Sequence, residues 1–288
     1  MHEYKISVAI SVYKKDNPKY FEQALKSVYG QTLLPDEVVL VIDGLVSEEI
    51  LNIIDQFKKE LYNKIAIKII QLPQNVGLGR ALNIAVNNCT YEYIARMDSD
   101  DICIPERFQL QIEKFKLEND LSVVGGGIVE FVNDINNVVG MRTVPTKHAD
   151  IIKFMKRRCP FNHVTVMFKK SAVLNAGNYK HLLYNEDYYL WIRLFQEGAK
   201  FANLAGNLVY VRVGKEMYKR RGGQVYFKSE YFIQKYLLKY KIIGKRTFLE
   251  NILIRVIVQL ILPNSVRGWF FKKFARQTKI LDRKKHRR

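Results

Sequence analysis

The chain has 288 residues, 48% of them hydrophobic and 26% charged, which excludes a disordered protein and allows a full hydrophobic core. Cys89, Cys103 and Cys159 form neither a disulfide framework nor a CxxC metal pair, so the sequence favours a reducing cytoplasmic setting. The formal net charge is +19, and residues 214–288 hold 21 Lys and Arg against 4 Asp and Glu, so this C-terminal quarter predicts an anionic partner.

The N-terminal half alternates short apolar runs with amphipathic segments. Met1 leads directly into the first apolar run, so we expect no signal peptide. The alternation predicts a mostly parallel sheet with right-handed crossovers and helices on its faces, an α/β fold. The expected strands are 6–12, 37–42, 65–70 and 93–97, and the expected helices are 18–29, 48–61, 78–88 and 105–118.

The pattern loosens after Val123, and no internal repeat is visible. The longest late apolar stretch, 252–262, is too short and too interrupted to span a membrane. We expect one domain at 1–225 and a basic helical extension at 226–288. Expected elements are strands at 123–132, 164–168 and 208–213, and helices at 147–156, at 188–197 with Gly198 as its C-terminal cap, and from 226 onward.

Three carboxylates follow the predicted fourth strand in Met97-Asp98-Ser99-Asp100-Asp101. In open α/β sheets, ligands bind beyond the carboxyl ends of the strands. Like charges this close repel each other, so the cluster favours a bound divalent cation. Mg²⁺ or Mn²⁺ keeps coordination positions open for phosphate oxygens, which points to a nucleotide substrate. A solvated acidic turn is the simpler alternative.

Three further motifs follow the first three predicted strands. Ser11-Val12-Tyr13 could form a wall for a nucleobase, and Asp43-Gly44 could accept hydrogen bonds from a base or ribose. The segment from Asn75 through Gly77 to Arg80 is a glycine-containing helix entry, although it lacks the dinucleotide fingerprint. Each motif alone is weak, and Asp43-Gly44 is also compatible with an ordinary turn. Their expected position at one edge of one sheet gives them weight.

A second acidic site, Glu186-Asp187, lies among aromatic residues at a predicted helix start. A carboxylate at this position also suits helix capping, which is the structural alternative. The functional interpretation is a general base, because partial burial raises the pKa of a carboxyl group toward the working pH.

Together these motifs resemble the family 2 inverting glycosyltransferases with the GT-A fold, which act in bacterial surface polysaccharide assembly. The resemblance covers about residues 6–225, and Arg220-Arg221-Gly222-Gly223 is similar to a motif of the O-antigen and capsule subset. It is carried by Ser11-Val12-Tyr13, Gln31-Thr32, Asp43-Gly44, Asn75-x-Gly77, Ala95 to Asp101, Pro105-Glu106-Arg107 and Glu186-Asp187-Tyr188.

The resemblance implies a role for each matching position. Asp187 is implied as the catalytic base with Glu186 beside it, and Asp100 as the direct ligand of Mn²⁺ or Mg²⁺, with Asp98 completing the pair and lying nearer the ribose. The implied nucleotide-sugar site comprises Ser11, Val12, Tyr13, Asp43, Asn75, Gly77, Arg80, Arg96, Asp98, Ser99, His163, Arg220 and Arg221. His163 could equally be a hydrogen-bonded structural histidine beside a strand.

The implied reaction moves a hexose from a UDP-sugar to a hydroxyl group of a lipid-diphosphate-linked saccharide, with inversion at the anomeric carbon. The C-terminal region combines Trp269 and Phe274 with Lys and Arg, which indicates a peripheral anchor at the inner face of the cell membrane. A packed helical subdomain with a solvated basic tail is the alternative.

Two other functions compete with this interpretation. A haloacid-dehalogenase-like phosphotransferase also carries a D-x-D motif, but after its first strand, whereas here the motif follows the fourth. A non-enzymatic nucleic-acid-binding protein would use the basic tail, but the aromatic residues near Trp269 form an apolar group instead of alternating as stacking platforms. We therefore expect no nucleic-acid partner.

Overall fold

The computed structural model describes residues 4–214 and 222–263. The N-terminal half builds four parallel strands joined by three helices, as the sequence predicts. Asn17 and Ser47 cap the first two helices through their side chains, which explains why those helices begin where expected. The elements are β1 (Ile6–Tyr13), α1 (Pro18–Tyr29), β2 (Glu37–Asp43), α2 (Glu48–Glu60), β3 (Ala66–Gln71), α3 (Leu78–Asn88) and β4 (Tyr93–Met97).

The second half completes one mixed sheet in the order β3-β2-β1-β4-β8-β6-β9-β5, with β7 paired to β6. β8 pairs antiparallel with both β4 and β6, so the run of parallel pairs through β1 to β4 is interrupted at β8, and parallel pairing returns between β6 and β9. The elements are β5 (Ile102–Cys103), α4 (Arg107–Leu117), β6 (Leu121–Phe131), β7 (Val138–Arg142), α5 (His148–Met155), β8 (Met167–Lys169), α6 (Lys170–Asn175), α7 (Glu186–Gln196) and β9 (Lys200–Arg212).

The strand expected at 164–168 is only partly correct. A 3₁₀ turn, η1 (His163–Thr165), occupies its first half, and strand pairing begins at Met167. The Thr165 hydroxyl donates to the Asn162 carbonyl at 2.8 Å, a local bond that competes with the sheet ladder. Gly198 has φ +78° just after α7, so the expected glycine cap is confirmed.

The core lies on both faces of the sheet. Side chains alternate along β1, so Val8 and Ile10 pack into a cluster with α1, α2 and α4, while Ala9 belongs to a cluster with α3, α6 and α7. The result is a three-layer α/β/α body. This arrangement leaves the carboxyl ends of β1 to β4 free to carry loops.

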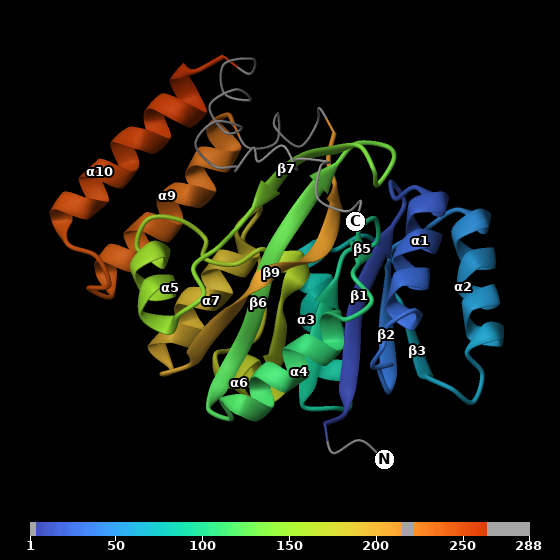
Figure 1. Cartoon of the computed structure of the whole chain (residues 1–288). Coiled ribbons are helices and arrows are strands. Elements are labelled where there is room, and N and C mark those ends of the chain that lie inside the picture. The colour runs from blue at the N-terminus through green and yellow to red at the C-terminus, as the bar shows by residue number, and fades with distance from the viewer. Residues whose placement is uncertain (1–3, 215–221, 264–288) are drawn as a thin grey trace, which may run out of the picture.

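Among residues 222–263, two helices follow the body, α9 (Gln224–Lys239) and α10 (Lys245–Arg255), and α10 continues into a π-helical turn, η2 (Val256–Ile261). Ile233 and Leu237 of α9 are fully buried in the same cluster as α7, so this part packs on the body. The pair lies at the end of the molecule away from α1 and α2 (Figure 1). Within residues 4–214 and 222–263, no helix is long and apolar enough to cross a bilayer.

Candidate functional site

The loops that follow β1 to β4 meet at one edge of the sheet. Tyr13 lies opposite Asp43 in the parallel register, and Ile10 lies opposite Met97. The motif after each strand therefore emerges at the same edge, as the sequence predicts.

Arg96 and Asp98 form a bidentate ion pair at the end of β4. The two guanidinium nitrogens Nη1 and Nη2 donate to the Asp98 carboxylate at 2.6 and 2.5 Å. Arg96 is only 2% exposed, and its Nε has no hydrogen-bond partner in the described part of the chain. The pair orients Asp98 and keeps a positive charge beneath the acidic loop.

Asp100 and Asp101 have different environments. Asp101 is buried and accepts a hydrogen bond from the Arg212 backbone N–H at 2.8 Å, which gives it a structural role. The Asp100 carboxylate receives no hydrogen bond from the described residues, and burial together with the Asp98 and Asp16 carboxylates raises its pKa to about 6. Among the described residues, the Asp100 carboxylate is therefore the one in this loop that accepts no hydrogen bond.

Sequence reasoning missed Asp16 and Arg212. Asp16 accepts hydrogen bonds from the Ser99 hydroxyl at 2.7 Å and from the Tyr13 N–H at 3.0 Å, which joins the loops after β1 and β4. The Arg212 Nε donates to the Asp100 carbonyl at 3.3 Å from the end of β9. Asp16 could have been suspected from its position three residues after Tyr13, whereas Arg212 had no sequence signal.

Asp43 holds the loop before α3. Its carboxylate accepts from the N–H groups of Val76 and Gly77, at 2.7 and 3.0 Å, and from the Asn75 amide at 2.9 Å. Gly44 has φ +87°, and a Cβ there would lie 2.7 Å from the Asn75 nitrogen. The structure thus connects the predicted Asp43-Gly44 motif with the predicted segment that begins at Asn75. The Asp43 carboxylate accepts its hydrogen bonds from this segment of the protein, whereas the sequence suggested a base or ribose as donor.

Glu186 and Asp187 open α7 and form the second acidic group. The Asp187 carboxylate accepts from the Tyr188 N–H at 2.7 Å and from the Cys159 thiol at 3.4 Å, and burial raises its pKa. Burial and the Asp187 charge raise the pKa of Glu186 to about 7. An ideal Cβ on Gly79 would lie 3.1 Å from the Glu186 Cβ, which places this group beside the first turn of α3.

Arg96 connects the two acidic groups electrostatically. Burial raises the pKa values of Asp100, Asp101, Glu186 and Asp187, and the Arg96 charge is among the interactions that oppose this rise at all four. The Asp98 charge also helps to raise the pKa of Glu186. The loop after β4 and the start of α7 therefore belong to one electrostatic neighbourhood.

His163 lies in the same neighbourhood. Its Nε2 lies 2.8 Å from the Tyr179 hydroxyl, and its ring contacts Trp191 edge-on. Burial, and then the Arg96 charge, lowers its pKa well below the usual value, so the imidazole is neutral at pH 7. His163 is thus a hydrogen-bonded histidine beside a strand, which is the structural alternative to a ligand-binding role.

The donor set fits a hard divalent cation shared with a substrate. Within residues 4–214 and 222–263, no three His, Cys, Asp or Glu side chains form a complete metal-binding group. Mg²⁺ and Mn²⁺ sites in nucleotide-dependent enzymes use one or two carboxylates and complete the shell with phosphate oxygens and water. The Asp100 carboxylate, which accepts no hydrogen bond from the described residues and lies near the Asp98 and Asp16 carboxylates, meets that requirement.

The other predicted residues differ in accessibility. The Val12 side chain is fully buried in the core, so a contribution of this residue to a ligand site would come from its backbone. Arg80 is exposed in the first turn of α3, and Ser11 and Tyr13 are partly exposed at the end of β1. Arg220 and Arg221 lie outside the described residues.

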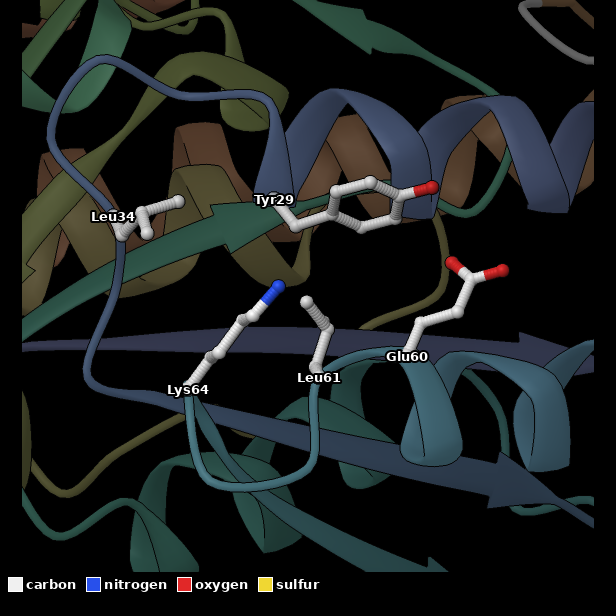
Figure 2. Close-up of a pocket in the computed structure, with 5 residues that line it drawn as sticks. All are labelled: Tyr29, Leu34, Glu60, Leu61 and Lys64. Atoms are coloured by element: carbon white, nitrogen blue, oxygen red, sulfur yellow. The ribbon is translucent and has the colours of Figure 1, made fainter.

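A separate surface pocket lies where α1 and α2 end, at the opposite edge of the sheet (Figure 2). None of the predicted site residues lines it. Its lining residues are Tyr29, Leu34, Glu60, Leu61 and Lys64.

Two curated relatives match almost the whole chain. The amylovoran biosynthesis glycosyltransferase AmsE of Erwinia amylovora is 39% identical, over 93% of this chain and 98% of its own length. An Escherichia coli UDP-Gal:alpha-D-GlcNAc-diphosphoundecaprenol beta-1,3-galactosyltransferase is 36% identical, over 95% of this chain and 97% of its own.

Solved structures share the fold at low sequence identity. TarS residues 1–349 of S. aureus, in complex with UDP-GlcNAc, has a TM-score of 0.60 at 18% identity, covering 96% of this chain and 76% of that one. The mannosyltransferase PcManGT of Pyrobaculum calidifontis, in complex with GDP-Man and Mn²⁺, has a TM-score of 0.61 at 14% identity, covering 94% and 76%. The expected GT-A-like architecture is thereby confirmed.

The family model for glycosyl transferase family 2 matches residues 7–183, which contain β1 to β8 and the acidic loop after β4. Near full-length relatives in polysaccharide assembly support the same assignment and disfavour a phosphotransferase or a nucleic-acid-binding protein. The chain belongs to glycosyl transferase family 2.

Proposed function

We propose that this chain is an inverting, metal-dependent hexosyltransferase that uses a UDP-sugar and a lipid-diphosphate-linked saccharide acceptor. Two relatives support both substrates. The galactosyltransferase named above uses UDP-Gal and a GlcNAc-diphosphoundecaprenol. A second relative, the Escherichia coli UDP-Glc:alpha-D-GlcNAc-diphosphoundecaprenol beta-1,3-glucosyltransferase WfgD, is 28% identical over 68% of this chain. The activity belongs to the assembly of cell-surface polysaccharide such as O-antigen or capsule.

One observation carries the proposal. The buried Arg96 pairs with Asp98 on the donor side and also acts on the carboxyl groups of Glu186 and Asp187. A transferase needs a phosphate-binding group and a base on opposite sides of the reacting carbon, and within reach of each other. The shared influence of the Arg96 charge on both acidic groups supports such an arrangement.

The donor nucleotide would lie along the edge where β1 to β4 end. Ser11 and Tyr13 would contact the base, and the loop from Asn75 to Gly77, held by Asp43, would lie beside the ribose or base. Ser99 and His163 would lie beside the ribose and diphosphate, and Arg80, Arg220 and Arg221 would offer bidentate contacts to phosphate.

Asp100, with Asp98 beside it, would hold Mn²⁺ or Mg²⁺. Bound there, the ion would act as a Lewis acid that offsets charge on the departing diphosphate. Arg96 neutralises part of the acidic loop and keeps Asp98 in place, so Asp100 stays available as the direct ligand.

Asp187 would act as the general base. Its carboxylate takes the proton from the acceptor hydroxyl while the hydroxyl oxygen attacks the anomeric carbon opposite the leaving UDP. The bond from the anomeric carbon to the diphosphate oxygen breaks with its electron pair, which inverts the configuration in one displacement. The raised pKa of Asp187 suits proton acceptance near neutral pH.

The acceptor defines the place of action. A saccharide on a lipid diphosphate lies at the membrane surface, so we propose a peripheral enzyme at the cytoplasmic face of the cell membrane. Residues 226–288 would supply the contact, and residues 1–225 would form the catalytic domain. Nucleic acid has no part in this proposal.

Radiolabelled UDP-sugars offered with synthetic lipid-diphosphate GlcNAc or GalNAc acceptors, with and without Mn²⁺, test the function. We expect transfer from one UDP-sugar, with Mn²⁺ dependence. Asp100→Asn should remove at least about a hundredfold of the rate. Asp120→Asn, at an exposed ion pair with Lys200, is the matched control and should keep full activity. Absence of transfer with every donor, or metal-independent transfer, would refute the proposal.

A further inference from the structure

The last described helix, α10 with its η2 extension, has its polar and apolar faces reversed. Asn251, Arg255 and Gln259, spaced four residues apart, are at most 8% exposed and face the body. The opposite face carries an ion pair between Arg246 and Glu250 at the start of the helix and six aliphatic side chains that are each 41–66% exposed. These six side chains, called the outer face below, are Leu249, Leu253, Ile254, Ile257, Leu260 and Ile261.

The buried polar face is fixed by specific bonds. Arg255 Nε donates to the Glu230 carboxylate of α9 at 2.7 Å, and Arg255 Nη2 donates to the Arg157 carbonyl at 2.9 Å. The Asn251 amide donates to the Lys156 carbonyl at 2.9 Å and to Gln234 at 2.8 Å. These bonds hold the helix in one rotation, so the aliphatic face cannot turn toward the core.

A helix on the surface of a water-soluble body shows the opposite pattern, with its apolar stripe toward the core. Single exposed aliphatic residues are ordinary, but six on one face of one helix form a contiguous patch of the kind that marks an interaction site. A partner that covers the outer face would therefore have to offer an apolar surface.

The charge of the surrounding sequence indicates that the partner is also anionic. The segment 224–263 contains seven Lys and Arg against two Asp and Glu, and residues 264–288 contain ten against one. A second copy of the chain would bring two cationic surfaces together, which is unfavourable. An anionic lipid surface satisfies both requirements, because it accepts aliphatic side chains at the acyl boundary and attracts Lys and Arg at the headgroups.

We propose that the outer face of α10 and η2 inserts into the interface of an anionic bilayer and docks the enzyme there, with the helix parallel to the membrane plane. The inference deepens the proposed function, on which it rests for the membrane location of the acceptor. It assigns the apolar part of the contact to six named side chains, instead of to the basic tail alone.

Flotation of the full-length protein with vesicles tests the assignment. Phosphatidylglycerol–phosphatidylcholine vesicles are compared with phosphatidylcholine vesicles, at low salt and at about 1 M salt, where the Debye length falls to about 3 Å. The variant Leu253→Gln with Ile257→Gln should lose about tenfold or more of its partition coefficient, and all residual binding at high salt. Leu117→Gln, which is 82% exposed on α4, should bind like the parent.

Three results would overturn the proposal. Equal flotation of parent and double variant at both salt concentrations would show that the face does not touch lipid. A parent dimer that the double substitution converts to monomer, seen by light scattering, would assign the face to a second copy. A large drop in melting temperature in the double variant would show that residues 264–288 or another part of the chain cover the face.

Transfer to a short-chain, water-soluble acceptor separates this inference from the proposed function. The double variant should retain the parent rate with that acceptor and lose rate only when the acceptor is embedded in vesicles. A parent protein without transfer activity would refute the proposed function while the flotation result still decides the membrane contact.

Discussion

A single buried residue, Arg96, organises the site. It neutralises Asp98 by a bidentate pair and moderates the carboxyl groups of both acidic clusters from beneath. A buried guanidinium is stable only when it is paired and hydrogen-bonded, so Arg96 and Asp98 depend on each other. The remaining negative charge is carried by carboxyl groups with raised pKa values, which suit proton transfer and cation binding.

The two carboxylates that open α7 should differ in their effect on the rate. Asp187→Asn removes the proposed base and should lower turnover by about 10²–10⁴-fold, because general-base catalysis contributes that much. Affinity for UDP, measured by calorimetry, should stay within about twofold, since the base does not touch the nucleotide. Glu186→Gln should lose less rate, and a larger loss in Glu186→Gln than in Asp187→Asn would transfer the role of base to Glu186.

The same pair predicts the pH dependence. A base acts only when unprotonated, and the pKa of Glu186 is raised to about 7 while that of Asp187 is also raised. The value of kcat/KM should therefore fall as the pH drops through the range in which this interacting pair titrates, which lies above the usual range of a carboxyl group, and level off at higher pH. In Glu186→Gln the acid limb should move down by about one pH unit, because one of the two like charges is gone. An unmoved limb would assign the titration to another group.

At the scale of elements, two loops from separate crossovers form one unit. Asp43 at the end of β2 accepts three hydrogen bonds from the segment between β3 and α3. Gly44 lies directly against Asn75 with φ +87°, a conformation and a distance that only glycine tolerates. The two motifs that appear independent in the sequence therefore support each other.

Gly44→Ala should cost about 1–3 kcal/mol of unfolding free energy, because it combines a positive φ with a Cβ contact of 2.7 Å. The KM for the donor should rise with it, since the loop beside the nucleotide shifts. Urea unfolding and donor kinetics measure both effects. Gly206→Ala, where an added Cβ has no neighbour within 4 Å, is the matched control. Equal stability of the two variants would show that the loops do not depend on this contact.

The formal charge of the whole molecule is unevenly distributed, with little net charge on the first 213 residues and a strongly basic C-terminal quarter. Of the net charge of +19, residues 214–288 carry +17, so the first 213 residues carry about +2. Attraction to anionic surfaces is therefore concentrated in the part of the chain that contains α9 and α10.

The preference for a UDP-sugar or a GDP-sugar donor can be tested by the change in melting temperature that each nucleotide produces. UDP with Mn²⁺, at about a hundred times its dissociation constant, should add about 2.7 kcal/mol and raise the melting temperature by about 5 °C. GDP under the same conditions should produce a much smaller rise. Structures of this fold hold either UDP-GlcNAc or GDP-Man, so the comparison is informative. A larger rise with GDP would contradict the proposed UDP-sugar.

Local patterns in the sequence were sufficient for the parallel half of the fold. The expected helices 18–29 and 78–88 and the expected strand 93–97 match α1, α3 and β4 in both bounds, because caps and apolar periodicity lie within a few residues of each element. The acidic motifs at strand ends were also visible, since a parallel sheet brings all such ends to one edge.

Other features depended on contacts between distant residues. β5 is two residues long and pairs with β9. This pairing places the Arg212 N–H beside the Asp101 carboxylate, although the two residues are 111 positions apart in the sequence. The bond between Ser99 and Asp16 spans 83 positions, and that between Cys159 and Asp187 spans 28. The reversed faces of α10 follow from burial against α9 and from bonds to Lys156 and Arg157. Periodicity reports only which residues share a face of a helix, whereas packing decides which face meets the protein and which is left for another partner.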